Sequence, residues 1–171
     1  MMPKRRQNET AINLYGDLMN SLELKIPPPA QFIITAAAIF GVSKIAPALK
    51  FSLSGSTALG IGLGIIGLSS GIMGVMQFKK AQTTPNPKEI DKATSLVTSG
   101  IYQYTRNPMY LGLVLMLLGW ALYLSHFLTF ILIPLFMMYI TRFQIQPEER
   151  MMTQKFGQNY QAYLEKVRRW I

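Results

Sequence analysis

The sequence predicts an all-α integral membrane protein with about four transmembrane helices and a C-terminal amphipathic helix at the membrane interface. Half of the 171 residues are hydrophobic and only 15% are charged, which is a low charged fraction for a soluble protein of this size. Three long runs carry no Lys, Arg, Asp or Glu: Ala30 to Gly41, Ala58 to Phe78 and Leu111 to Tyr139. Because such runs approach the ~20 residues that cross a bilayer, they predict transmembrane helices.

The formal charge of +9 indicates a membrane, rather than a nucleic acid, as the partner of the basic residues. Clustered Lys and Arg in a soluble protein neutralise phosphates, but here they lie beside the apolar runs, where they hold a cytoplasmic face. We therefore expect the lipid bilayer as a partner and no nucleic acid. The chain has no cysteine and its only histidine is His126, so the sequence predicts neither a disulfide framework nor a metal site.

Residues 1–29 form an N-terminal segment that we expect to be cytoplasmic or interfacial. Apolar side chains recur in it at spacings of three and four residues: Ile12, Tyr15, Met19, Leu22 and Ile26. This pattern is typical of an amphipathic helix on a membrane surface, and a frayed tail remains the alternative. Prolines 27–29 stop any helix and can open the next one, so the first span is expected from Ala30 to about Ala46.

Residues 30–78 hold the first two spans, which we interpret as scaffold. The second span, from about Thr57 to Phe78, carries glycines that recur at four and three residues: Gly60, Gly64, Gly67, Gly71 and Gly74. Small residues let helices approach closely in lipid, where no hydrophobic force drives them together. A phosphate-binding loop would instead follow a strand and end in Lys-Ser/Thr. The glycine stripe therefore predicts a packing face for another helix, and it leaves a homo-oligomer through this face open.

Residues 79–171 form the remaining unit, which contains a polar loop, a helical hairpin and a tail. The loop from Lys79 to Thr98 carries four lysines and is expected on the cytoplasmic side. The third span should run from Asn107 or Pro108 to about Leu124, and the fourth from Phe127 to Arg142. The turn between them has no Lys or Arg, which places it on the opposite side, so both termini are expected to be cytoplasmic.

The tail from Gln146 to Ile171 is predicted to be helical. Its apolar residues fall at spacings of three and four: Met152, Phe156, Tyr160, Tyr163, Val167 and Trp170. The segment is too polar to span a bilayer. We therefore expect it to lie in the cytoplasmic interface, with its aromatic side chains at headgroup depth.

Two polar stretches carry the candidate chemistry. Glu148 and Glu149 follow Pro147 directly beneath the fourth span, which is an ordinary helix start but also a carboxylate pair suited to an ammonium or sulfonium group. In the stretch from Arg106 to Tyr110, a proline starts the third helix. A helix start presents unpaired N–H groups to a ligand carboxylate or hydroxyl, and an arginine beside it can hold a carboxylate through two parallel hydrogen bonds.

An ordered set of motifs runs through the second half of the chain: Leu96-Val97-Thr98-Ser99-Gly100-Ile101-Tyr102, Arg106-Asn107-Pro108-Met109-Tyr110-Leu111-Gly112, Glu148-Glu149, Phe156-Gly157-Gln158-Asn159-Tyr160 and Tyr163. This set resembles the integral-membrane methyltransferases. That superfamily groups isoprenylcysteine carboxyl methyltransferase with the phospholipid methyltransferases. The resemblance covers roughly residues 80 to 170.

The resemblance implies S-adenosylmethionine as the cofactor, bound on the cytoplasmic side, and a lipophilic or small-molecule methyl acceptor. It carries cofactor contacts onto one set of residues: Thr94, Ser95, Leu96, Val97, Tyr102, Asn107, Pro108, Met109, Tyr110 and Glu148. The expected catalytic residues are Arg106, Arg142 and Glu149. Where the resemblance implies arginines just before the acidic pair, this chain has Gln144 and Gln146, which disfavours a carboxylate acceptor.

The alternative from another functional class is a non-enzymatic four-span protein, either a transporter or a structural subunit. Transport paths carry charged residues inside the membrane, whereas this chain has essentially none there and gathers its polar residues on one face. Within the enzyme class, the acceptor stays open among a lipid amine, a lipophilic carboxylate and a small thiol.

Overall fold

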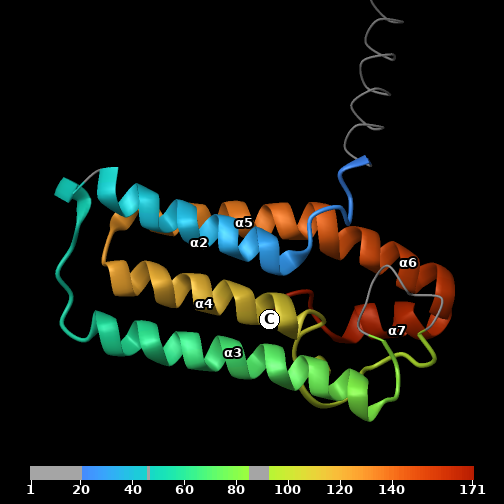
Figure 1. The fold of residues 1–171 in the computed structure, drawn as a ribbon. Helices are drawn as coiled ribbons and strands as arrows, with labels where there is room; N and C mark the ends of the chain where they lie inside the picture. Colours follow the sequence, from blue (N-terminus) through green and yellow to red (C-terminus); the bar gives the residue numbers. More distant parts are fainter. Residues whose placement is uncertain (1–20, 46, 85–92) are drawn as a thin grey trace, which may run out of the picture.

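A computed structural model describes residues 21–45, 47–84 and 93–171 of the chain, as Figure 1 shows. Most of the predicted N-terminal amphipathic helix and the middle of the polar loop lie outside these described residues. The α-helices are α2 (Pro28–Ile45), α3 (Ser56–Lys80), α4 (Pro108–Leu124), α5 (Leu132–Ile140), α6 (Gln146–Phe156) and α7 (Gln158–Lys166). Shorter turns are η1 (Pro47–Leu49), η3 (Gly100–Gln103), η4 (Phe127–Ile131) and the π-helical η5 (Thr141–Ile145).

Helix α4 is the centre of the bundle, because it lies between α3 on one side and the pair α2 and α5 on the other (Figure 1). The buried core is apolar and comes mainly from α2, α4, α5 and η5: Ile39, Tyr110, Val114, Leu117, Ala121, Ile133, Phe136, Ile140 and Ile145. The outer face of α3 leaves large apolar side chains exposed: Leu59, Ile61, Ile65, Ile66, Leu68, Ile72, Met73 and Met76. An apolar surface of this extent fits contact with lipid.

The predicted fold class is confirmed. In the part of the chain that the structure describes, three helices are long and apolar enough to cross a membrane: Pro28–Ile45, Ser56–Lys80 and the composite helix Phe127–Phe156. Helix α4 is a shorter apolar helix of 17 residues, which is at the lower end of the ~17–25 residues that span a bilayer. The described residues contain no strand beyond an isolated bridge between Lys50 and His126. The chain is therefore an all-α integral membrane protein.

The glycine stripe of α3 packs inside the molecule against α4. A Cβ atom added to Gly60 would lie 2.6 Å from the carbonyl oxygen of Gly119, and one added to Gly67 would lie 2.5 Å from that of Gly112. Gly64 has nothing within 4 Å of its added Cβ. Only part of the glycine stripe therefore packs against α4. Gly60 and Gly67, which are seven residues apart, hold α3 and α4 in close contact. A homo-oligomer through the other glycines stays a prediction.

Replacing Gly67 by Ala is expected to push α3 away from α4 and to destabilise the protein by about 1–3 kcal/mol, as overpacking does. The matched control is Gly64→Ala on the same helix, where the added methyl group meets open space. Thermal unfolding in detergent micelles measures both. Equal melting temperatures for the two variants would contradict the close contact between α3 and α4.

The prediction of one continuous C-terminal helix is wrong, because the tail breaks at Gly157. This glycine has φ 53° and ψ −126°, a backbone conformation that side-chain-bearing residues rarely adopt. The chain turns there from α6 into α7, and α7 ends at Lys166, after which Val167 has an extended backbone. The helix that carries the predicted fourth span continues past Arg142, since α5 runs through η5 directly into α6.

Candidate functional site

The two predicted polar stretches meet at one end of the bundle, where the start of α4 faces α6, α7 and the loop after α3 (Figure 1). Most of the predicted site residues line a single cavity there: Ser95, Leu96, Val97, Tyr102, Arg106, Asn107, Met109, Tyr110, Glu148 and Glu149. The tertiary structure therefore brings the loop, the start of α4 and the acidic pair to one place.

Three predicted residues do not line this cavity. Thr94 is exposed and donates its hydroxyl to the carbonyl of Gln82 at 3.1 Å. Pro108 is buried as the first residue of α4, and its carbonyl oxygen accepts a hydrogen bond from the Ser70 hydroxyl at 2.8 Å. Arg142, a predicted catalytic residue, instead forms an ion pair with Glu23.

Several lining residues were not among the predicted site residues: Phe78, Thr84, Ala93, Ile145, Met152, Tyr160 and Tyr163. The tail's apolar spacing identified the last three of these as one helical face, but it gave no indication of what that face covers. Phe78 lies in the last turns of α3, which the sequence assigned to the scaffold.

Tyr110 and Glu148 join the two polar stretches directly. The Tyr110 hydroxyl donates to Glu148 Oε1 at 2.5 Å, across 38 positions of sequence. A hydrogen bond to a carboxylate is short and strong. Among the described residues, no Lys or Arg forms an ion pair with Glu148. The Glu148 carboxyl group thus faces the cavity with one hydrogen-bond donor and with no cation paired to it among the described residues.

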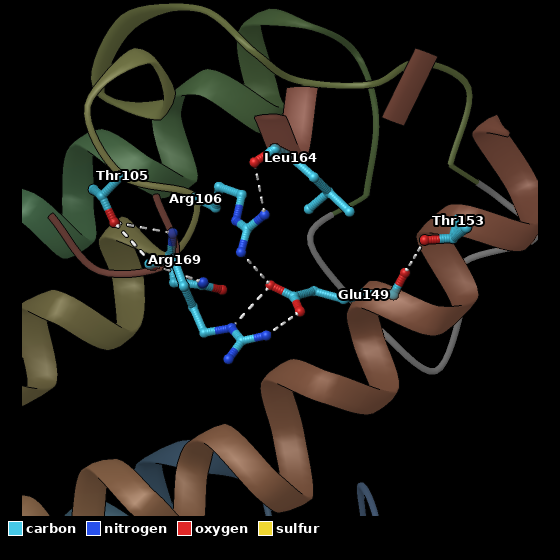
Figure 2. Close-up of polar contacts among 7 residues, drawn as sticks. Thr105, Arg106, Glu149, Thr153, Leu164 and Arg169 are labelled. Atoms are coloured by element: carbon cyan, nitrogen blue, oxygen red, sulfur yellow. Dashed lines mark hydrogen bonds and ion pairs between the residues drawn. The ribbon is translucent and has the colours of Figure 1, made fainter. Parts of the chain in front are cut away.

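Glu149 lies at the centre of an ion-pair cluster, which Figure 2 shows. Arg106 Nη2 lies 3.0 Å from Glu149 Oε1. Arg169 donates two parallel hydrogen bonds to the same carboxylate, from Nε to Oε1 at 3.1 Å and from Nη2 to Oε2 at 2.7 Å. The side chains of Arg106 and Glu149 are only 12% and 15% exposed. Such a partly buried two-point contact fixes the orientation of both partners.

The C-terminal residues lie against the start of α4. The Arg106 amide donates to the carbonyl of Arg168 at 3.0 Å. The carbonyl of Arg169 accepts from the Asn107 side chain at 2.9 Å and from the Thr105 hydroxyl at 3.3 Å. Asn107 precedes α4, but its side chain makes no capping hydrogen bond to that helix. It holds the C-terminal segment instead.

Tyr102 presents a buried donor to the cavity. Its ring packs edge-on against Phe78, with ring centres 5.5 Å apart, and its backbone carbonyl accepts the Tyr163 hydroxyl at 2.7 Å. The Tyr102 hydroxyl is buried and has no hydrogen-bond partner among the described residues. Burial raises the pKa of Tyr102 above its usual range, so the phenol keeps its proton and can donate to a ligand.

Comparison with known proteins matches this chain to a family of membrane methyltransferases. A family model described as phospholipid methyltransferase matches residues 56–159. A fission-yeast protein (Schizosaccharomyces pombe), named protein-S-isoprenylcysteine O-methyltransferase, is 36% identical over 72 residues, which are 42% of this chain. The match spans only 30% of that enzyme's length.

A second relative, from Haemophilus influenzae, is 44% identical over 63 residues. This match covers 37% of the chain and the whole of that relative, which is described as an uncharacterized protein. No solved structure matches the chain. The matched family region includes α3, α4, the hairpin and α6, and it excludes α2 and the residues before it.

Proposed function

The chain belongs to the phospholipid methyltransferase family, and from this premise we propose that it transfers a methyl group from S-adenosylmethionine to a lipophilic acceptor at the cytoplasmic membrane face. The observation that carries the proposal is the hydrogen bond between Tyr110 and Glu148. It joins the start of α4 to the acidic pair across the helical hairpin, and both side chains line one cavity.

The side chains of this cavity suit the chemical groups of the cofactor. Tyr102 Oη and Arg106 Nε are buried donors without a partner among the described residues, and such groups are rare in native proteins. These two donors would bind the carboxylate or the ribose hydroxyl groups of the cofactor, and Glu148 would bind the cofactor's amino group or ribose. The rings of Phe78 and Tyr160 provide flat surfaces for the adenine base. When bound, the cofactor supplies an electrophilic methyl group on a sulfonium.

The size of the cavity implies that its walls adjust on binding. It measures about 100 Å³ among the described residues. This is below the ~300–1,000 Å³ of typical small-molecule sites. Met109 and Met152 line it, and their unbranched side chains change rotamer more readily than branched ones. We therefore expect cofactor binding to require movement of lining side chains.

An apolar groove reaches the same place from the membrane side. It has a volume of about 590 Å³ and lies between α3, α4 and the start of α2. Met109 and Tyr110 line both the groove and the cavity. The groove suits a hydrocarbon chain, because nearly all of its lining side chains are apolar, with Lys79 in the last turn of α3 at one end. An acceptor held there would place its polar end near Tyr110.

Methyl transfer from a sulfonium is an in-line displacement in which a positive charge disappears, so alignment and exclusion of water matter most. In this chain Tyr110 orients Glu148, and Glu149 orients Arg106. The apolar side chains that line the groove disfavour water in it. Lys79 and Lys80 end α3 beside the cavity, which supports a cytoplasmic location through the preference of basic residues for that side.

Calorimetry on the purified full chain in detergent tests the cofactor. We expect saturable binding of S-adenosylmethionine and of its demethylated product, S-adenosylhomocysteine. Adenosine and methionine, offered separately, serve as controls and should bind more weakly, since each engages only part of the cavity. Failure of both S-adenosylmethionine and S-adenosylhomocysteine to bind would refute the proposal.

A labelling experiment identifies the acceptor. Membranes that contain the protein are incubated with methyl-labelled S-adenosylmethionine, and the label is followed into lipid, protein and volatile fractions. We expect transfer to a lipophilic acceptor, so the label should appear in the lipid fraction or on lipidated protein. Label found only in a volatile thioether would show a small thiol acceptor and contradict the role of the groove.

A further inference from the structure

The segment Ser21–Ile26, which we call the strap, contacts the helix that carries Glu148 and Glu149. Glu23 forms ion pairs with Arg142 in η5 and with Arg150 in α6. These two arginines lie on either side of the acidic pair in sequence. The side chain of Glu23 is only 12% exposed, while those of Arg142 and Arg150 are 32% and 54% exposed, so the carboxylate itself is the buried partner of the two ion pairs. The strap is thus attached both to η5 and to α6.

The backbone of the strap replaces a hydrogen bond that Pro147 removes. In an α-helix the amide of residue 147 would donate to the carbonyl of Phe143, but proline has no N–H. The Leu24 amide donates to this carbonyl instead, at 3.0 Å. Leu24 has φ 56°, a left-handed conformation that leucine rarely adopts, and such strain persists only where surrounding contacts hold it. The strap therefore stabilises the irregular turn η5.

Two glutamine side chains hold the end of the strap. The carbonyl of Ile26 accepts from Gln31 Nε2 and from Gln144 Nε2, each at 2.8 Å. Gln144 is buried in η5, at a position where the resemblance noted above leads one to expect an arginine. In this chain the Gln144 side chain donates a hydrogen bond to the strap, and it does not line the cavity.

We propose that the strap sets the bend at η5 that aims Glu148 at Tyr110 and Glu149 at Arg106 and Arg169, with Glu23 as the positioning residue. Irregular turns at a proline have few hydrogen bonds of their own, so the bend angle depends on the groups that occupy the freed carbonyls. The strap lies before residue 56, where the family match begins, so it is outside the matched region. The effect of Glu23 on catalysis rests on the proposed function, whereas its effect on the bend does not.

The test compares Glu23→Gln with Lys25→Gln in the full chain. Both variants change one charge in the strap, but Lys25 is exposed. Hydrogen–deuterium exchange measures the protection of peptides that cover residues 143–150, with α3 as an internal reference. S-adenosylhomocysteine affinity is measured by calorimetry. In Glu23→Gln we expect faster exchange confined to residues 143–150 and about tenfold weaker affinity, the size of effect typical of residues that act through others. Lys25→Gln should match the wild type in both measurements.

Glu23→Asp provides the rescue variant, because it keeps the charge and should restore part of the protection that Glu23→Gln loses. Unchanged exchange at residues 143–150 in Glu23→Gln would overturn the proposal. So would faster exchange spread equally over α3, since it would show only a general loss of stability. If the wild type binds no S-adenosylhomocysteine, the proposed function fails, while the exchange measurement still decides the role of the strap.

Discussion

Glu149→Gln is expected to destabilise the protein by about 3 kcal/mol, because removing one partner of a buried ion pair leaves an uncompensated charge. The unpaired charge would be that of Arg106, whose side chain is 12% exposed. Arg169 would lose its two-point contact with the same carboxylate. The C-terminal segment would keep its neutral hydrogen bonds to Thr105, Asn107 and the Arg106 amide and the packing of Trp170 against the core, but no ion pair to Glu149.

Chemical unfolding in detergent measures this loss, and limited proteolysis at the C-terminus reports release of the segment after Lys166. The matched control is Glu165→Gln, the same change at an exposed acid of α7. We expect it to leave both measurements at wild-type values. If Glu149→Gln were as stable and as protease-resistant as Glu165→Gln, the ion-pair cluster would have no structural role.

Tyr110→Phe is expected to lower kcat/KM for methyl transfer about 100-fold, as small misplacements of aligned groups do. The substitution removes only the hydroxyl that donates to Glu148 at 2.5 Å, so the ring still fills the wall between cavity and groove. Stability should change little by comparison. Tyr104→Phe is the control, since Tyr104 is 76% exposed and lies outside the cavity lining.

A double-mutant cycle separates this contact from independent effects. If Tyr110 and Glu148 act as one unit, the variant that combines Tyr110→Phe with Glu148→Ala should be no slower than the slower single variant. Losses that multiply would show that the two side chains act separately. If Tyr110→Phe kept wild-type activity, the hydrogen bond between Tyr110 and Glu148 would have no role in methyl transfer. The proposed function would then lose its main support.

The membrane-spanning pattern and the helix starts could be predicted because they depend on local sequence. Uncharged apolar runs marked α2 and α3 and, as a single run, α4 and α5, and Pro108 marked the first residue of α4. The glycine spacing in α3 predicted a packing face, and α4 occupies part of it. The paired stretches around Tyr110 and Glu148 were predicted to share a site, and they do share one cavity.

The contacts of the tail and the strap could not be predicted, because they join residues far apart in sequence. Arg169 lies in the predicted interfacial helix, where the sequence indicated no partner for it. The break at Gly157 brings it to Glu149. Arg142 was expected at the site because it precedes the acidic pair. Glu23, 119 positions away, pairs with it instead.

The sequence by itself determined that this is an all-helical membrane protein with a polar site at one end, since hydrophobic length and helix-start signals are properties of short segments. Tertiary structure alone decided which charges meet. A carboxylate binds whichever arginine the packing brings within reach, so Glu149 takes Arg106 and Arg169, and Glu23 takes Arg142 and Arg150. Those choices follow from the π-helical stretch η5 and the turn at Gly157, two places where the backbone leaves the regular α-helix.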